Sequence, residues 1–132
     1  MRLGLDLLFL VPGETGGRET YSRELLRALR ATAPGLHVTT FLNAETAAAG
    51  PGWWQQLADR AVVLGRVGAR RLPRWALGEA AGLVRAAGNA RVEVLHSPAN
   101  LGPAVGPFAR VLTLHDLMYR RQRDLVNPLV RA

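Results

Sequence analysis

The sequence contains no cysteine and no lysine. Without cysteine the chain can form neither a disulfide framework nor a thiolate metal site, which suits a reducing cytoplasm. All seventeen basic residues are therefore arginine, and together with the abundant alanine and glycine this bias indicates a GC-rich bacterial genome.

Long apolar runs are absent as well. No run approaches the ~20 residues that a membrane-spanning helix needs. The opening "MRLGLDLLFLV" is interrupted by Asp6 and is not followed by an A-x-A cleavage site. We therefore interpret this run as a buried strand and not as a signal peptide.

Several common site signatures are missing too. The chain has no G-x-x-x-x-G-K-[ST] motif, which excludes a P-loop, and no G-x-G-x-x-G motif. No clear acidic residue ends the second predicted strand, which argues against a dinucleotide site. The three histidines have no spacing that implies a metal site.

Length and composition indicate one globular domain, residues 1–132. Of these residues 48% are hydrophobic and 20% are charged, which excludes a disordered chain. The net charge of +7 favours anionic partners such as nucleotides, phosphates or an acidic membrane face. The alternative is that the arginines only form a solvated surface.

Apolar runs typical of strands alternate with segments of helical periodicity. Helices are predicted after a glycine turn, ending at Pro34-Gly35, at Trp53-Trp54 and over residues 72–87. The alternation predicts an α/β fold, a Rossmann-like parallel sheet with helices on both faces. The predicted strands are residues 3–10, 37–42, 61–65, 91–95 and 110–114.

A paired glycine, Gly16-Gly17, lies where the first strand gives way to the first helix in "FLVPGETGGRETYSRELLRAL". Such a turn lets backbone amides and the helix dipole face an anion, and glycine permits close approach and positive φ. The same pattern also fits a purely structural turn. Within the helix, Glu19 and Arg23 are predicted to form an i,i+4 ion pair.

Each of the last two predicted strands runs into a histidine, in "RVEVLHSP" and "RVLTLHDL". His115, followed by Asp116, is placed to donate a hydrogen bond or to act as acid or base, unless it only satisfies a local backbone carbonyl. His96 has the same position before Ser97, whereas His37 begins a strand and is interpreted as structural. Because ligands bind at the carboxyl ends of parallel strands, the glycine pair and both histidines should share one rim of the sheet.

Three blocks, in this order, resemble the amino-terminal domain of bacterial family-4 glycosyltransferases, which have the two-domain GT-B fold. The first block is "GLDLLFLVPGETGGRETYSRELLRAL", similar to the family's opening strand, Gly-Gly turn and first helix. The second is "VEVLHSPAN" and the third is "RVLTLHDL". Each block is weak alone, but together they are fairly specific, and they span nearly all of the chain.

The resemblance implies a catalytic function and a set of site residues. Gly16 and Gly17 would border the diphosphate of a nucleotide-sugar donor, and His115 would point into the cleft beside the transferred sugar, with Asp116 positioning the turn. The sugar would be transferred with retention of configuration, without a cofactor or a metal, to a sugar or lipid-linked acceptor. The acceptor side would be lined by His96, Ser97 and Asn100.

The chain departs from the family's pattern in two places and lacks part of it. Leu7-Leu8 stand where the family often has Ala-Arg, and "MYRRQRD" follows "HDL" in place of a Pro-Glu segment. The family's donor-binding domain, with its E-x-x-x-x-x-x-x-E pair, has no counterpart here. A helix start at Asn127-Pro128 is followed by only four residues, so we expect an incomplete domain that does not catalyse transfer alone.

Other functions stay open on the sequence. One is a stand-alone Rossmann-like module that binds a nucleotide or phosphate without catalysis. Another is a basic protein at a membrane, because "RVGARRLPRW" could lie on anionic lipid at the inner face of the membrane, unless it is a solvated helix start. No nucleic-acid-binding module is visible. Surfaces exposed by truncation would favour self-association.

Overall fold

A computed structural model describes residues 1–70 and 72–115 of the chain. Strands and helices alternate along it, as the sequence predicts. In chain order the elements are β1 (Arg2–Leu7), α1 (Gly17–Thr32), β2 (His37–Leu42), α2 (Ala44–Ala48), α3 (Trp53–Gln56), β3 (Arg60–Val63), α4 (Leu72–Leu77), the π-helical turn η1 (Gly78–Leu83), α5 (Val84–Asn89), β4 (Val94–Ser97) and β5 (Ala109–Leu112).

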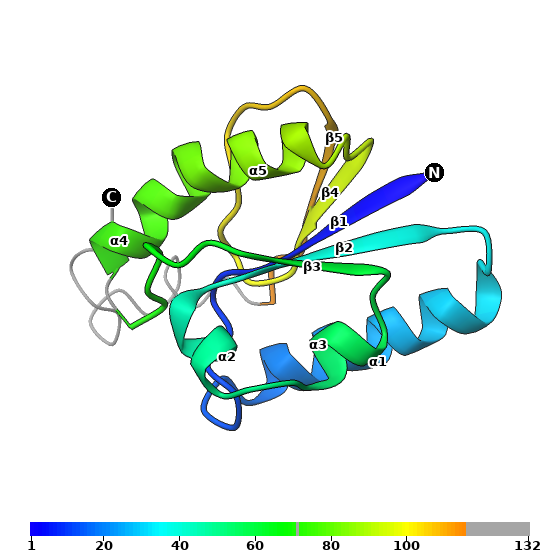
Figure 1. Cartoon of the computed structure of the whole chain (residues 1–132), viewed down its shortest axis with the longest axis horizontal. Coiled ribbons are helices and arrows are strands. Elements are labelled where there is room, and N and C mark those ends of the chain that lie inside the picture. The colour runs from blue at the N-terminus through cyan, green and yellow to red at the C-terminus, as the bar shows by residue number, and fades with distance from the viewer. Residues whose placement is uncertain (71, 116–132) are drawn as a thin grey trace.

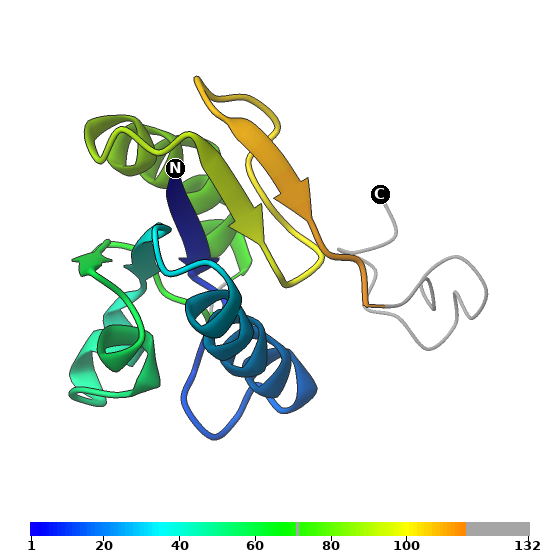
Figure 2. The same cartoon turned by 90° about the vertical axis from the view of Figure 1, so that its right-hand side faces the viewer.

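The strands form one five-stranded sheet in the order β3-β2-β1-β4-β5, and every pair is parallel. Figure 2 shows β4 and β5 side by side with their carboxyl ends at the same edge. The chain leaves β3 on one side of β1 and returns as β4 on the other, so the order reverses at the boundary between β1 and β4. This confirms the predicted α/β, Rossmann-like fold.

Helices cover both faces of the sheet (Figure 1). On one face, Leu3, Leu5 and Leu7 of β1 join Leu26 of α1 and Trp54 of α3 in a buried cluster. The other face is covered by the continuous helix α4–η1–α5, whose packing against the sheet includes a second cluster: Leu8, Phe41, Val67, Leu83, Ala87, Val92, Leu95 and Phe108. The leucines of β1 thus pack in the first cluster, whereas Gly4 and Asp6 of β1 face the side of the second.

Strand β1 ends at Leu7, although the apolar run continues to Leu10. The reason is local: Asp6 Oδ1 accepts a hydrogen bond from the Leu8 amide at 3.1 Å, and the Leu10 amide bonds back to Leu7. An aspartate that bonds the backbone two residues on favours a turn over a continued strand. Asn43 Nδ2 then holds the turn by donating to the carbonyls of Leu8 and Leu10.

Strand β4 begins and ends later than predicted, at Val94–Ser97 instead of residues 91–95. Arg91 has a φ of 53° and belongs to the turn after α5, which delays the strand. As a result His96 and Ser97 lie within β4 and point to opposite faces of the sheet. Strands β3 and β5 also differ from the predicted bounds by one or two residues.

Some sequence-based expectations fall outside this description or stay predictions. Asp116 and the helix start at Asn127-Pro128 lie outside the described residues. Every helix within residues 1–70 and 72–115 is too short or too polar to cross a lipid bilayer. Val111 and Leu112 of the edge strand β5 are about half exposed, at 46% and 47%, yet self-association and contact with a membrane surface remain predictions.

Gly4 in the middle of β1 allows close packing on the η1 side of the sheet. A Cβ there would lie 2.8 Å from Leu95 Cδ1 and 2.9 Å from Phe41 Cε2. We expect Gly4→Ala to destabilise the protein by about 1–3 kcal/mol through overpacking, measured by urea denaturation. Gly35→Ala is the control, because a Cβ at Gly35 meets no atom within 4 Å. Equal stability of the two variants would contradict the prediction.

Candidate functional site

The loop between β1 and α1 takes its shape from glycines in the left-handed region. Gly13 and Gly16 have φ values of 80° and 57°. A Cβ at Gly16 or Gly17 would meet no atom within 4 Å, so space inside the chain does not require glycine at either position. At Gly16 the requirement is conformational, whereas at Gly17 the described residues impose none.

Glu19 fastens this loop to α1. Its Oε2 atom accepts hydrogen bonds from the Gly13 amide at 2.9 Å and the Thr15 hydroxyl at 3.5 Å, and its Oε1 atom accepts one from Trp53 Nε1 at 3.3 Å. The predicted ion pair with Arg23 is therefore wrong. Arg23 bonds Glu24 instead, at 2.9 Å, so Glu19 serves the loop and not the exposed face of the helix.

The first turn of α1 leaves backbone donors free. The Gly16 carbonyl accepts hydrogen bonds from the amides of Glu19 and Thr20, at 3.1 and 3.2 Å. The amides of Gly17 and Arg18 have no acceptor within the described residues. Because Gly16, the N-cap residue, has no side chain, nothing on that residue blocks a ligand from reaching these two amides.

His115 and Asn100 come together from the loops after β5 and β4. Asn100, with a φ of 64°, accepts a hydrogen bond from the His115 amide at 2.8 Å through its Oδ1 atom. His115 Nε2 donates to the Pro98 carbonyl at 2.6 Å. A carbonyl can only accept, so Nε2 carries the proton. In the neutral ring Nδ1 then keeps a lone pair for another partner.

The sequence left open that His115 only satisfies a local backbone carbonyl, and its bond to the Pro98 carbonyl is such a contact. The second ring nitrogen is still available to a ligand, because only Nε2 bonds Pro98 and the residue is exposed. His115 can therefore have both a structural contact and a free acceptor.

These loops border one hollow of about 340 Å³ at the carboxyl edge of the sheet. Arg18 is the one cationic side chain among the described residues that line it, and its guanidinium lies 5.5 Å from the centre of the Phe9 ring. The hollow thus combines a positive charge, the start of a helix and several polar groups. Its lining residues are Thr15, Gly17, Arg18, Asn100 and His115.

Behind the hollow, Tyr21, Thr113 and His96 form a hydrogen-bonded group. The Thr113 hydroxyl lies 2.7 Å from His96 Nε2 and 3.2 Å from the Tyr21 hydroxyl. The Tyr21 ring also meets the His115 ring edge-on, with centroids 5.1 Å apart. Burial lowers the pKa of His96 below its ordinary value of 6.5, so this ring is neutral at pH 7.

Ser97 is not brought to the hollow. It is buried and lines a separate small cavity with Gly102, on the face of the sheet that carries Leu95. A Cβ at Gly102 would lie 2.6 Å from Ser97 Oγ, which shows how closely the following loop covers it. The structure thus unites Gly17, Asn100 and His115, leaves His96 behind the hollow, and separates Ser97.

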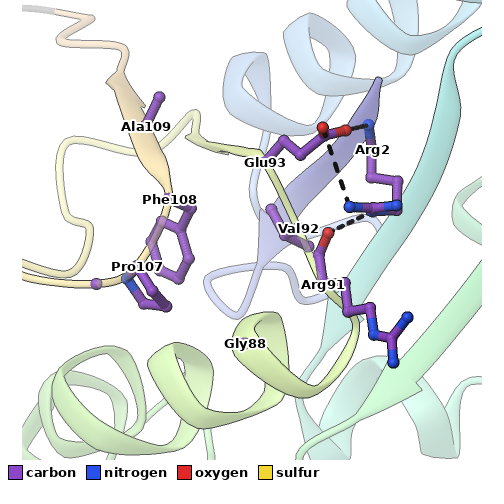
Figure 3. A pocket seen from close by; sticks show the side chains of 9 residues that line it. Arg2, Gly88, Arg91, Val92, Glu93, Pro107, Phe108 and Ala109 are labelled. Carbon is purple, nitrogen blue, oxygen red and sulfur yellow. Dashed lines mark hydrogen bonds and ion pairs between the residues drawn. The ribbon is translucent and has the colours of Figure 1, made fainter.

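A larger hollow, of about 740 Å³, lies at the opposite, amino-terminal edge of the sheet (Figure 3). Two arginines line it, Arg2 and Arg91. Arg2 is already bonded, because its Nε donates to the Arg91 carbonyl at 2.5 Å and its backbone amide donates to the Glu93 carboxylate at 2.6 Å. The Glu93 carboxylate, 3.9 Å from the Arg2 guanidinium, also lowers the local positive charge. This hollow also lies at the carboxyl end of α5, where the helix dipole disfavours an anion, whereas the hollow beside Arg18 lies at the amino end of α1.

Sequence reasoning missed three polar members of the carboxyl-edge site: Arg18, Tyr21 and Thr113. The signal for Tyr21 was its position four residues after Gly17, which places it on the same helix face as the glycine turn. Thr113 lies two residues before His115, and this polar residue inside the apolar run 111–114 was the available signal.

No known protein family, curated protein or solved structure matched the chain when it was compared with them. Within residues 1–70 and 72–115, no three histidine or acidic side chains are grouped so that they could hold a metal ion.

The buried His96 ring gives a prediction about pH. A proton binds the exposed histidine of the unfolded chain at about pH 6.5, but the folded chain resists it, so the stability contributed by the neutral His96 ring is lost as the pH falls below about 6.5. An NMR titration should give His96 a pKa below 6.5, and His96→Gln should weaken the acid loss of stability. A measured pKa at or above 6.5 would contradict the burial argument.

Proposed function

We propose that the chain is the amino-terminal, acceptor-side domain of a retaining glycosyltransferase of GT-B architecture that uses a nucleotide-diphosphate sugar. The observation that carries this proposal is the meeting of Gly17, Asn100 and His115 around one hollow. These residues come from the three sequence blocks that resemble family-4 glycosyltransferases. They lie far apart in the chain and meet only because parallel strands end at a common edge.

The donor's diphosphate is assigned to the start of α1. Two free amides, the positive end of the helix dipole and the Arg18 guanidinium all favour an anion there. Positive groups that face a departing diphosphate stabilise the charge that develops as the sugar is transferred. The proposal gives this role to Arg18 and to basic residues of a donor domain outside this chain, so this chain alone is inactive.

The transferred sugar and the acceptor are assigned to the opposite wall. His115 Nδ1 and the Asn100 side chain are exposed polar groups on that wall. Hydroxyl groups of a sugar both donate and accept hydrogen bonds, so they suit such a mixed set. His96 would act indirectly in this scheme, by holding Thr113 and Tyr21 behind His115.

A second candidate is a stand-alone module that binds a nucleotide or phosphate without catalysis. The free amides of α1 and Arg18 are enough for that function, and His115 would then serve only the Pro98 carbonyl. The two candidates differ in what they require of His115. They differ also in the downstream reading frame, where a glycosyltransferase needs a donor domain with its pair of glutamates.

Arg18→Gln tests the diphosphate site. We expect roughly ten- to hundredfold weaker binding of nucleoside diphosphate sugars, because a charge-assisted hydrogen bond contributes about 1.5–3 kcal/mol. Isothermal titration calorimetry on the full-length protein measures the change. Arg85→Gln, an exposed arginine of α5 that does not line the hollow, is the control. Equal weakening in both variants would mean that only the net charge matters.

His115→Ala distinguishes the two candidate functions. In saturation-transfer NMR on the full-length protein, with a panel of nucleotide sugars, the wild type should saturate both the sugar and the base protons. The variant should lose the signal of the sugar protons, keep that of the base protons, and lose transferase activity. Unchanged sugar signals would favour the module without catalysis.

A further inference from the structure

Two carboxyl side chains from different layers are buried between the sheet and the helix that covers it. Asp6 lies at the carboxyl end of β1 and Glu79 in η1, and each residue is only 2% exposed. Asp6 faces away from Leu5 and Leu7, so it points to the α4–η1–α5 side of the sheet. Neither residue belongs to the hollow beside Arg18.

The carboxylate oxygens of Asp6 and Glu79 could accept more hydrogen bonds than they receive. Asp6 Oδ1 accepts from the Leu8 amide at 3.1 Å, and Glu79 Oε1 accepts from Trp75 Nε1 at 2.8 Å. Glu79 Oε2 has no donor among the described residues, and neither carboxyl takes part in an ion pair there. A proton on Glu79 would supply the missing donor and bond the two side chains to each other.

Electrostatics favour such a proton. Burial, followed by the negative charge of Asp6, raises the pKa of Glu79 to about 10. Burial also raises the pKa of Asp6, and hydrogen bonds from Glu79, Leu8 and Ser97 oppose that rise. Among the described residues, the groups that bond the pair are the Trp75 indole from α4, the Leu8 amide from the turn after β1 and the Ser97 hydroxyl from β4, and these three groups carry no positive charge.

The helix that carries Glu79 is irregular at this place. Residues Gly78–Leu83 form a π-helical turn, a rare geometry that usually persists only where surrounding contacts favour it. Gly78 brings the backbone close to Val67, whose Cγ2 atom would lie 2.6 Å from an added Cβ. The widened turn and this close contact together bring the Glu79 side chain to the sheet.

We propose that Asp6 and Glu79 share a single proton, which fastens the π-helical turn η1 to the carboxyl end of β1, and that loss of this proton in alkaline solution loosens the helix layer. The inference concerns Asp6, the residue that ends β1 just before the glycine loop. It is independent of the proposed sugar transfer, because the pair lies on the other face of the sheet.

The test is the pH dependence of unfolding by urea. The folded state holds the Glu79 proton up to about pH 10, whereas the unfolded chain releases it near the ordinary value of 4.5. Between these values the unfolded state binds fewer protons, so the unfolding equilibrium constant should rise with pH, by up to about tenfold per pH unit. The measurement runs from pH 7.5 upward, where His96 is neutral in both the folded and the unfolded chain and does not contribute to the slope.

Glu79→Gln is the main variant. The amide still accepts from Trp75 and can donate permanently to Asp6, so the alkaline rise of the unfolding constant should largely disappear. Glu24→Gln is the control, because Glu24 is exposed on α1 and a lowered pKa keeps it ionised throughout this range. It should follow the wild type. Equal pH slopes for wild type and Glu79→Gln would overturn the proposal.

Two further measurements cover the case in which Glu79→Gln does not fold. Asp6→Asn supplies an amide donor to Glu79 from the other side and should also flatten the alkaline slope. Infrared spectroscopy of the wild type at pH 8 should show the carbonyl band of a protonated carboxylic acid, and this band should be absent from Glu79→Gln. Absence of this band from the folded wild type would overturn the proposal on its own.

Discussion

The parallel pairing of β1 with β2 on one side and β4 on the other is the constraint on which the rest of the structure depends. The register sets Gly4 opposite Leu95 and Leu5 opposite His96, and thereby fixes which side chains share a face. Leucines of β1 then pack against α1, while Gly4 and Asp6 face the helix that contains η1. Because all strands run the same way, the loops that follow β1, β4 and β5 meet at one edge. A slip of one residue would exchange the two faces and separate the site.

Most of the fold could be predicted from the sequence, because apolar runs and helical periodicity report burial directly. Strand β2 was predicted with its observed bounds, since β-branched and aromatic residues fill it between clear breakers. The ends of β1 and β4 were not, because single contacts decide them: Asp6 bonds the Leu8 amide, and Arg91 adopts a left-handed backbone conformation. The π-helical turn was also beyond prediction, because it depends on packing between layers that are distant in sequence.

The candidate site was only partly predictable, because a sequence pattern locates strand ends but not the contacts between side chains from different strands. The rule that ligands bind at the carboxyl ends of parallel strands located Gly17 and His115 from the sequence alone, the family resemblance added Asn100, and the structure places all three around one hollow. Ser97 was grouped with His96 because the two are adjacent in sequence, but adjacent residues of one strand point to opposite faces. The polar group formed by Tyr21 and Thr113 depends on a contact between residues 92 positions apart, which no local pattern reports.

The alternation of side chains along β4 places His96 and Ser97 in two different polar groups, one on each face of the sheet. His96 points to the α1 face and bonds Thr113 behind the hollow, whereas Ser97, the next residue, points to the other face and acts on Asp6. The β1–β4 boundary therefore supports an open polar site on one face and a buried acid pair on the other. In the proposed function, a donor or acceptor in the hollow would contact the loops that follow these strands, and the shared proton proposed for Asp6 and Glu79 would hold β1 against the helix layer where its loop begins. The open polar site and the buried acid pair thus both depend on the positions of the carboxyl ends of β1 and β4.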